Sequence, residues 1–214
     1  MRTHLRLKNR QVRKLPKQFQ DQDVRYTDEL VATFLRQYTQ PGDRVLDPFA
    51  GFGTTLIAAE AMDRQPLGIE YDKQRVAYVR TQLQQPQRII HGDSRQIANY
   101  NLPPCDFSIT SPPFMAKNDP EDPFSNYAPN GPGYAAYLRT LTEIYQQISQ
   151  IMKPGARVVL EVANLKEQDG VTTLAWDIGR ELSAIMTFEG EVIIAWDNYN
   201  YGYDHSYCLV FRCG

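Results

Sequence analysis

The sequence predicts an α/β protein built on one doubly wound parallel sheet. Strand-like apolar runs and helical patterns alternate along the chain, and turn residues such as Pro41-Gly42 and Pro154-Gly155 separate them. Neither a repeat nor an interdomain linker interrupts this order. The 214 residues are 42% apolar and 22% charged, close to the average for soluble domains. We therefore expect one layered domain of seven strands, with about six helices on both faces of the sheet.

The first half of the chain follows the alternation closely. Thr27 is expected to cap an amphipathic helix that begins with Asp28 and Glu29 and ends near Tyr38, because apolar residues recur there at helical spacing. Short apolar runs predict strands at 44–47, 67–70, 88–90 and 106–110. The intervening segments have helical patterns, so helices are expected at 54–62, 72–83 and 94–99.

The second half begins with an interruption. Residues 115–133 contain four prolines and two glycines without apolar periodicity, which predicts a long loop. Helical spacing resumes from 134 to 152, and another helix is expected from about 172 to 185. Apolar runs predict the remaining strands at 157–161, 191–196 and 206–212.

Composition narrows the setting of the protein. Cys105, Cys208 and Cys213 are too few and too irregularly spaced for a disulfide framework, so we expect a reducing, cytoplasmic environment. The longest apolar runs are far shorter than the roughly 20 residues that span a bilayer, and the N-terminal segment lacks the apolar stretch of a signal peptide. Membrane and secreted proteins are therefore not expected.

Charge is distributed unevenly along the chain. Residues 1–20 carry seven basic side chains and no acidic one, whereas the other 194 residues carry 16 basic and 25 acidic side chains. We define residues 1–23 as a basic N-terminal arm. Two interpretations stay open: the arm binds a polyanion such as nucleic acid, or it is a solvated, partly disordered terminus.

A glycine-rich loop joins the strand at 44–47 to the following helix. It has the sequence Asp-Pro-Phe-Ala-Gly-Phe-Gly-Thr-Thr over residues 47–55, and Glu70 ends the next strand. Ligands of open α/β sheets bind at the carboxyl ends of the strands, where glycines admit a ligand and an acid accepts hydrogen bonds from ribose hydroxyls. The pattern indicates a nucleoside cofactor. NAD and ATP are disfavoured, because Leu56 replaces the third glycine of a dinucleotide motif and no P-loop lysine follows Gly53.

A second motif, Thr110-Ser-Pro-Pro-Phe114, ends another strand at the same edge of the sheet. Two prolines cannot continue a central strand, so the chain must leave it as a stiff hook. The Ser111 hydroxyl and the Pro112 carbonyl would accept the protons of a planar, conjugated amino group, which makes its nitrogen more nucleophilic. Phe114 would stack on the ring, as in pockets for flipped bases.

The two motifs resemble those of the S-adenosylmethionine-dependent amino-methyltransferases of nucleic acids, the N4-cytosine and N6-adenine family known from restriction–modification. The loop is similar to their cofactor motif, and Ser111-Pro-Pro-Phe114 is similar to the Ser-Pro-Pro-Tyr/Phe motif of the enzymes that make N4-methylcytosine in DNA. Residues 25–27 resemble a segment near the methionine carboxylate, and residues 92–94 one in which the acid meets the adenine amine. The resemblance spans roughly residues 24–212.

This resemblance implies a Rossmann-like seven-stranded methyltransferase sheet, mostly parallel, whose last strand is antiparallel. It also implies S-adenosylmethionine as the cofactor, no metal, and direct transfer of the methyl group to cytosine N4, ahead of adenine N6. The catalytic residues would be Ser111, Pro112, Pro113 and Phe114. The cofactor-binding residues would be Arg25, Thr27, Asp47, Phe49, Gly51, Gly53, Thr54, Thr55, Glu70, Asp93 and Ser94.

Residues 24–214 are expected to form a single catalytic domain, without the separate target-recognition domain that many family members carry. Substrate contacts are expected from the basic arm, which would hold phosphates, and from the lid-like loop 115–133, which contains Lys117. The loop before the last strand would contact bases through Tyr199, Tyr201 and Tyr203, or these tyrosines cover the core instead. DNA is favoured over RNA as the partner, and a homodimer or a separate specificity partner is left open.

Other reactive side chains receive no catalytic role. Cys105 follows a proline, as does the nucleophile of enzymes that methylate cytosine at carbon 5, but it precedes its strand at the edge remote from the glycine loop. His205, Cys208 and Cys213 alternate between the two faces of one strand and cannot converge on zinc. The competing functions are methylation of RNA, methylation of a protein glutamine amide, and binding of cofactor and nucleic acid without turnover.

Overall fold

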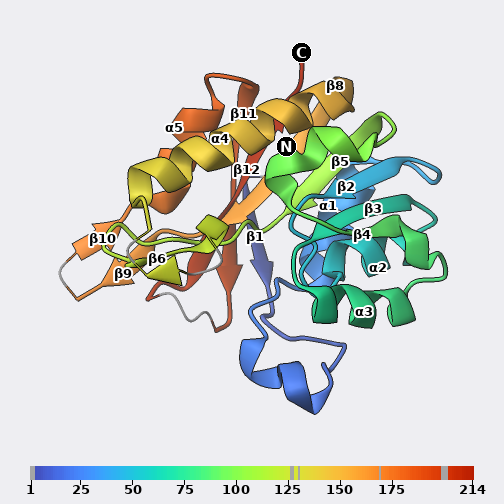
Figure 1. The fold of residues 1–214 in the computed structure, drawn as a ribbon, viewed down its shortest axis with the longest axis horizontal. Coiled ribbons are helices and arrows are strands. Elements are labelled where there is room, and N and C mark those ends of the chain that lie inside the picture. Colours follow the sequence, from blue (N-terminus) through green and yellow to red (C-terminus); the bar gives the residue numbers. More distant parts are fainter. Residues whose placement is uncertain (1–2, 126–127, 130, 169, 199–201) are drawn as a thin grey trace.

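The computed structural model describes residues 3–125, 128–129, 131–168, 170–198 and 202–214. Among these, the central sheet has eight strands in the order β1-β11-β12-β8-β5-β2-β3-β4 (Figure 1). The last strand, β12 (His205–Arg212), runs antiparallel to both of its neighbours, β11 (Thr187–Trp196) and β8 (Met152–Val162). All other neighbouring pairs in this sheet are parallel. The predicted mainly parallel α/β fold with an antiparallel last strand is confirmed.

The predicted elements form, with small shifts at their ends. The remaining predicted strands are β2 (Arg44–Asp47), β3 (Gln65–Glu70), β4 (Ile89–His91) and β5 (Cys105–Thr110). The helices are α1 (Asp28–Tyr38), α2 (Thr54–Ala61), α3 (Lys73–Gln82), α4 (Tyr134–Ile151) and α5 (Leu174–Leu182). The segment expected as a helix at 94–99 is the 3-10 helix η3 (Ser94–Tyr100).

Helix α5 is shorter than the predicted 172–185. Thr172 belongs instead to β10 (Gly170–Thr172), which pairs with β9 (Leu165–Glu167) in a small separate hairpin. The hydroxyl of Thr172 donates to the Glu167 carboxylate at 2.8 Å and accepts the backbone N–H of Lys117 at 2.9 Å. These side-chain bonds compete with helix formation and delay the first turn of α5.

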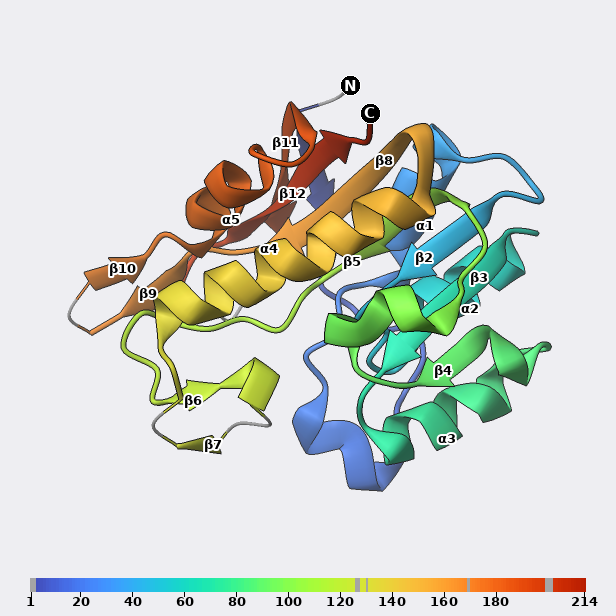
Figure 2. The same ribbon diagram turned by 45° about the horizontal axis from the view of Figure 1, so that its top comes forward.

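Helices cover both faces of the sheet. Helices α1, α2 and α3 pack on one face, and α4, α5 and η3 pack on the other, where Figure 2 shows α4 and α5 in front of the sheet. The core beneath α4 is built from Tyr137, Leu141, Tyr145 and Ile148, all buried against the sheet. Among the described residues, no helix has both the length and the apolar character needed to cross a bilayer.

The N-terminal segment contributes an eighth strand that the sequence does not predict. Strand β1 (His4–Leu7) pairs in parallel with β11, and Leu7 lies opposite Trp196. Farther along, the 3-10 helix η1 (Lys17–Gln22) buries Phe19. Within the described residues, the basic arm is therefore anchored by Leu7, Leu15 and Phe19, while most of its other residues are exposed. Its strand went undetected because only two leucines mark it among basic residues.

The loop at 115–133 contains a small hairpin. Strands β6 (Glu121–Asp122) and β7 (Ala128–Pro129) pair antiparallel, and the short 3-10 helix η4 (Pro123–Ser125) lies between them. The sequence predicts the loop but not this pairing, because two-residue strands rich in proline carry no periodic signal.

Replacing Leu7 by alanine tests the edge strand. Because Leu7 is buried in the core beneath α1, Leu7→Ala should lower the free energy of unfolding by about 2 kcal/mol. His4→Ala, at an exposed position of the same strand, should change it by less than about 0.5 kcal/mol. Urea denaturation followed by circular dichroism measures both. Equal and negligible effects would mean that residues 4–7 do not pack on β11.

Candidate active site

A cleft of about 820 Å³ opens at the carboxyl edge of the sheet. The glycine loop and the hook of residues 111–114 both line it, although more than 50 residues separate them in the sequence. Residues from five other segments complete its walls. The predicted site residues that line the cleft are Arg25, Phe49, Gly51, Thr54, Glu70, Asp93, Ser94, Ser111, Pro112, Pro113 and Phe114.

The buried carboxylate of Asp47 joins the glycine loop to the hook. It accepts hydrogen bonds from the Thr110 hydroxyl at 2.6 Å, the Tyr26 hydroxyl at 3.3 Å and the backbone N–H of Phe49 at 3.0 Å. Burial raises the pKa of Asp47, although these hydrogen bonds oppose the rise. Asp47 does not line the cleft, so its predicted role as a cofactor ligand is not evident in the geometry. It positions the residues that do line the cleft.

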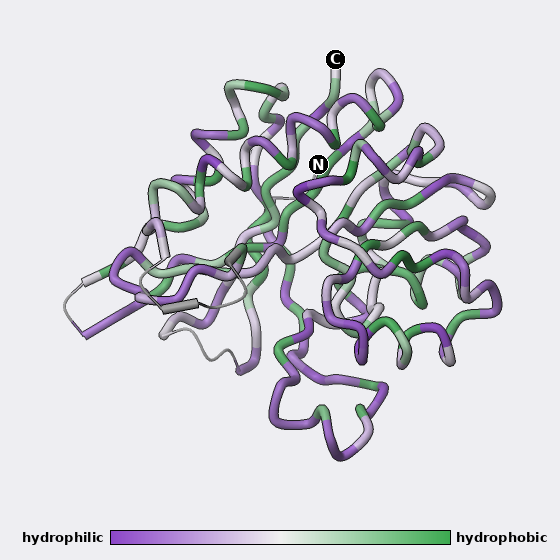
Figure 3. Tube along the Cα trace, viewed as in Figure 1, coloured by the Kyte–Doolittle hydropathy of each residue, from purple (hydrophilic) through white to green (hydrophobic). Residues whose placement is uncertain are grey.

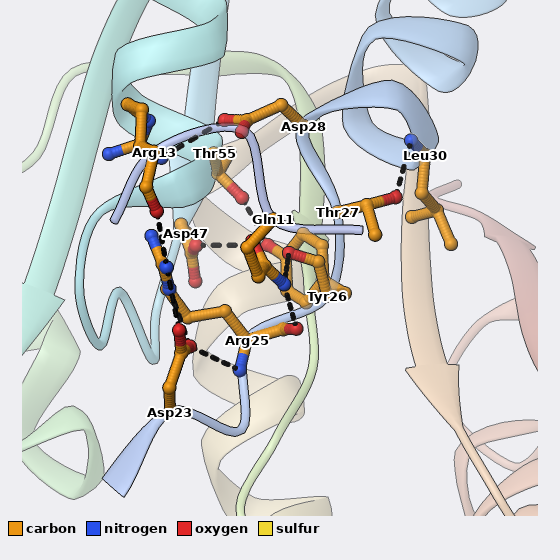
Figure 4. Close-up of polar contacts among 10 residues, drawn as sticks. All are labelled: Gln11, Arg13, Asp23, Arg25, Tyr26, Thr27, Asp28, Leu30, Asp47 and Thr55. Atoms are coloured by element: carbon orange, nitrogen blue, oxygen red, sulfur yellow. Dashed lines mark hydrogen bonds and ion pairs between the residues drawn. The ribbon is translucent and has the colours of Figure 1, made fainter. Parts of the chain in front are cut away.

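Thr55 reinforces this connection from the first turn of α2. Its hydroxyl donates to the Ile109 carbonyl of β5 at 3.3 Å and is hydrogen-bonded to the Tyr26 hydroxyl (Figure 4). Burial and the neighbouring Asp47 raise the pKa of Tyr26, so its phenol stays protonated and can donate. Strands β2 and β5 and the segment before α1 are thereby fixed to one another at the floor of the cleft.

Glu70 organises the opposite wall. Its carboxylate accepts the backbone N–H groups of Gly51 and Asp72, both at 2.8 Å. Burial raises the pKa of Glu70 despite these bonds. Each carboxylate oxygen has a further lone pair, so the side chain can accept more hydrogen bonds from a ligand in the cleft.

Backbone conformation and close packing explain why glycine occupies two positions of the loop. Gly51 and Gly53 have φ angles of +51° and +76°, the left-handed region in which glycine is favoured. A Cβ atom on Gly53 would also lie 2.8 Å from a methyl group of Val79 on α3. Gly53 therefore permits close packing of α2 on α3 and does not itself line the cleft.

Asp93 and Ser94 lie at the start of η3. The Asp93 carboxylate forms an ion pair with Arg95 at 2.6 Å. Burial acts to raise the pKa of Asp93, but the hydrogen bonds and charge of Arg95 outweigh it and hold the pKa below its usual range. The Ser94 hydroxyl donates to the Pro48 carbonyl. Asp93 therefore presents an ionised acceptor to the cleft.

Two buried polar groups at the cleft lack partners. The Arg25 side chain is only 5% exposed and makes an ion pair with Asp23 at 2.7 Å. It also donates to the Arg13 carbonyl at 2.8 Å, yet its Nη1 has no hydrogen-bond partner (Figure 4). The hydroxyl of Thr54 is likewise buried and unpartnered. Buried donors without partners are costly, so both groups indicate a polar ligand.

The hook presents its polar atoms to the cleft. Neither the Ser111 hydroxyl nor the Pro112 carbonyl takes part in a hydrogen bond with another described residue. The next carbonyl, that of Pro113, accepts the Tyr137 hydroxyl at 2.8 Å, which fixes the hook against α4. Acceptors held in place but free to bond suit an amino group.

Aromatic rings form one wall beside the hook. The ring of Phe124, from the loop at 115–133, lies 5.4 Å from Tyr137 in a stacked arrangement and 6.1 Å from Phe49. Both Phe49 and Phe124 line the cleft, as does Phe114. This wall is suited to a flat, conjugated ring.

Several predicted site residues lie outside the cleft. Thr27 caps α1 by accepting the Leu30 N–H at 3.3 Å. The Lys117 side chain is directed toward Asp177, 4.0 Å away, and Tyr203 packs on His205 with ring centroids 5.4 Å apart. Tyr199 and Tyr201 lie outside the described residues. Thr55 and Gly53 belong to the supporting structure described above.

The sequence prediction missed other residues that line the cleft. These come from segments next to the recognised motifs: Val24, Tyr26, Tyr71, Asp72, Arg75, Arg95, Ala116, Asp119, Pro123, Phe124 and Leu165. Position in the strand order predicts part of this set, because Tyr71 follows Glu70 directly. Phe124 has no such signal, since its loop folds back only through tertiary contacts.

The cysteines do not contribute to the site. Burial raises the pKa of the Cys105 thiol to about 12, so it carries no thiolate at neutral pH. Cys208 and Cys213 are also buried. Within the described parts of the chain, no group of three or more His, Cys, Asp or Glu side chains is arranged to hold a metal ion.

Solved structures show which class of fold surrounds this cleft. TrmN from Thermus thermophilus superposes with a TM-score of 0.63 at 18% identity, over 88% of this chain and 49% of that one. A methyltransferase from Pyrococcus furiosus gives 0.58 at 15% identity, over 88% and 83% of the two chains. A TehB-like SAM-dependent methyltransferase from Corynebacterium glutamicum gives 0.57 at 13% identity, over 86% and 87%. The fold is methyltransferase-like.

Sequence comparison gives matches over part of the chain. Residues 7–81 match the N6/N4 methyltransferase family, described as DNA methylase. The type II methyltransferase M.MthZI from Methanothermobacter thermautotrophicus is 47% identical over 47 residues, which is 22% of this chain and 13% of that protein. These findings support the resemblance to the DNA amino-methyltransferases of the N4/N6 family; the family match covers the glycine loop and ends before the Ser111–Phe114 hook.

Removing the Asp47 carboxylate tests its role as the connection between the two motifs. Asp47→Ala would leave the Thr110 hydroxyl and the Phe49 N–H buried without an acceptor, so the free energy of unfolding should fall by about 3 kcal/mol. Asp21→Ala, at an exposed position, should change it by less than about 0.5 kcal/mol. Urea denaturation compares the two variants. A small loss at Asp47 would contradict the connection.

Proposed function

We propose that this protein transfers a methyl group from S-adenosylmethionine to an exocyclic amino group of a DNA base, with cytosine N4 as the favoured target. The observation that carries the proposal is that the glycine loop and the Ser111–Phe114 hook line one cleft. The family match supports amino-methylation of nucleic acid. The preference for cytosine rests on Ser111, because the adenine enzymes of the family that this chain resembles usually have aspartate at that position.

The polar groups of the cleft fit the proposed cofactor. S-adenosylmethionine carries ribose hydroxyls, an adenine amine and a carboxylate, and when bound it supplies an electrophilic methyl group on a sulfonium sulfur. Glu70 would accept the ribose hydroxyls, and Asp93 would accept the adenine amine. The unpartnered Nη1 of Arg25 would donate to the carboxylate.

The hook would prepare the amine for transfer. The lone pair of a conjugated NH2 is delocalised into the base, so the nitrogen is a poor nucleophile. When the Ser111 hydroxyl and the Pro112 carbonyl accept hydrogen bonds from its two N–H groups, the nitrogen shifts toward a tetrahedral state with a localised lone pair. As the bond from nitrogen to the methyl carbon forms, the bond from sulfur to that carbon would break and leave a neutral thioether, and one amine proton would be lost to water. Phe114 would hold the ring by stacking.

Residues 24–214 would act as the catalytic unit, with the loop at 115–133 as its lid. The contact of Phe124 with Phe49 and Tyr137 supports this assignment, because it brings the loop against the cleft. Base flipping would place the target ring between this aromatic wall and the hook.

Labelled nucleosides test the proposal. The protein is incubated with methyl-labelled S-adenosylmethionine and pools of DNA or RNA, which are then digested to nucleosides and separated. Label in N4-methylcytosine from DNA is the expected result. Label in N6-methyladenine would correct the base, and label confined to RNA would replace the substrate. Label in 5-methylcytosine would contradict the mechanism.

Ser111→Ala separates an enzyme from a binding protein. The variant loses one of the two proton acceptors, so methyl transfer should fall by roughly 100-fold to 10,000-fold while affinity for S-adenosylmethionine stays unchanged. Radiometric transfer and calorimetric titration measure the two quantities. Ser183→Ala, at the exposed C-cap of α5 and outside the cleft, is the matched control. Unchanged transfer in the Ser111 variant would remove the hydroxyl from the mechanism.

Glu70 predicts a pH dependence of cofactor binding. Its ionised carboxylate accepts hydrogen bonds from hydroxyls, whereas the protonated form loses charge and acceptor strength. Because burial raises the pKa of Glu70, affinity should be full at neutral pH and fall on acidification, before an ordinary glutamate with a pKa of about 4.3 would titrate. Calorimetry across this range measures the effect. Glu70→Gln should flatten the profile and Glu29→Gln should not; identical profiles would refute the assignment.

A further inference from the structure

The residues that follow β1 form a fixed strip along the carboxyl edge of the sheet. We call residues 8–19 the N-terminal strip. In Figure 1 the chain leads from the dark-blue β1 through this strip into the blue loop at the bottom of the view. The backbone N–H of Asn9 donates to Asp197 at 2.8 Å, at one end of the edge. Farther along the strip, Leu15 and Phe19 are buried with Phe52 of the glycine loop, which follows β2 in the interior of the sheet. The strip therefore runs from β11 to the cofactor loop.

The strip has an inner and an outer side. Gln11 donates to the Arg25 carbonyl at 2.6 Å, and Arg13 forms an ion pair with Asp28 at 3.0 Å (Figure 4). With Leu15 and Phe19, these residues face the protein. The exposed residues form the outer side, which includes four cations, Lys8, Arg10, Lys14 and Lys17, together with the uncharged residues Asn9, Val12, Pro16 and Gln18.

The outer cations are not neutralised by the protein. None of Lys8, Arg10, Lys14 and Lys17 forms an ion pair or a side-chain hydrogen bond with another described residue. In Figure 3 the strip is mostly hydrophilic. Because residues 1–20 contain no acidic side chain, the strip is a local positive surface on an otherwise acidic chain.

The strip also adjoins the cleft. Val24, Arg25 and Tyr26 line the cleft, and Arg25 is bonded to the strip in both directions: its carbonyl accepts Gln11 and its Nη2 donates to the Arg13 carbonyl at 2.8 Å. Gln11 and Arg13, which alternate in sequence with the outer cations, therefore join the strip to the cleft wall.

We propose that the outer side of the N-terminal strip binds the phosphate backbone of DNA beside the base that enters the cleft. The inference rests on the proposed function, since it assumes that a base occupies the cleft. Exposed lysine and arginine side chains without acidic partners attract phosphates and release counterions. Such contacts position a duplex without reading its sequence, so the strip would supply affinity and register rather than specificity.

The test uses residues 1–214 with four substitutions. In the strip variant, Lys8, Arg10, Lys14 and Lys17 are each replaced by glutamine; these side chains make no described internal contact, so folding should be preserved. In the control variant, Arg36, Arg44, Arg80 and Arg88 are replaced by glutamine, which removes the same charge at the opposite edge of the sheet. Fluorescence anisotropy measures binding of a labelled mixed-sequence DNA duplex at increasing salt.

The salt dependence of DNA affinity shows whether the strip binds phosphates. Each phosphate contact contributes about 0.9 to the magnitude of the slope in a plot of log affinity against log salt. The slope of the strip variant should therefore be smaller in magnitude by up to about 3.6. The control variant should keep the slope of the unsubstituted protein. An unchanged slope in the strip variant, or an equal loss in the control, would overturn the inference. So would a labelled RNA duplex that binds through the strip while DNA does not.

Failure of the strip can be distinguished from failure of the proposed function. Binding of S-adenosylmethionine should be the same in all three proteins, because no substituted residue lines the cleft. At high DNA concentration the strip variant should still methylate the same nucleoside, with a raised KM and a similar kcat. A fall in kcat with unchanged DNA affinity would show that the strip acts on catalysis and not on phosphate binding.

Discussion

The site depends on one buried carboxylate. Asp47 ends β2, and its oxygens are shared by a strand neighbour, the following loop and the segment before α1. Two motifs that are distant in sequence are thereby held at a fixed separation before any ligand arrives. Removing such a charge from water is unfavourable unless several donors surround it, so the carboxylate and its donors are needed together. The geometry of the cleft is thus a property of the folded chain itself.

Much of the fold could be predicted because local patterns agree with tertiary structure. The helix capped by Thr27 and the alternating strands follow apolar periodicity, and the structure confirms both. The edge strand could not be predicted, since Leu5 and Leu7 gain their meaning only from pairing with β11. The same reason hid the hairpin within residues 115–133. Short elements stabilised by distant partners leave no periodic trace.

The site was predictable to a similar degree. Residues with a chemical signature, such as the glycine loop and the Ser111 hook, lie in the cleft as expected. Asp47 and Thr55 were assigned to cofactor contact, but the structure gives them a supporting role one layer below. Motif spacing cannot distinguish these roles, because both require a polar side chain at the end of a strand. Phe124 was missed because its position depends on stacking against Tyr137.

The route of the chain after β1 has a practical consequence. The strand lies at the far edge of the sheet from β4, yet the residues that follow it end against Phe52 in the glycine loop. Residues 4–19 thus link β11 to the loop after β2, although these two strands are not neighbours in the sheet. A shortened version that begins at α1 would lack β1, which pairs with β11, and would expose the ring of Phe52 in the glycine loop. Expression designs should retain this segment whole.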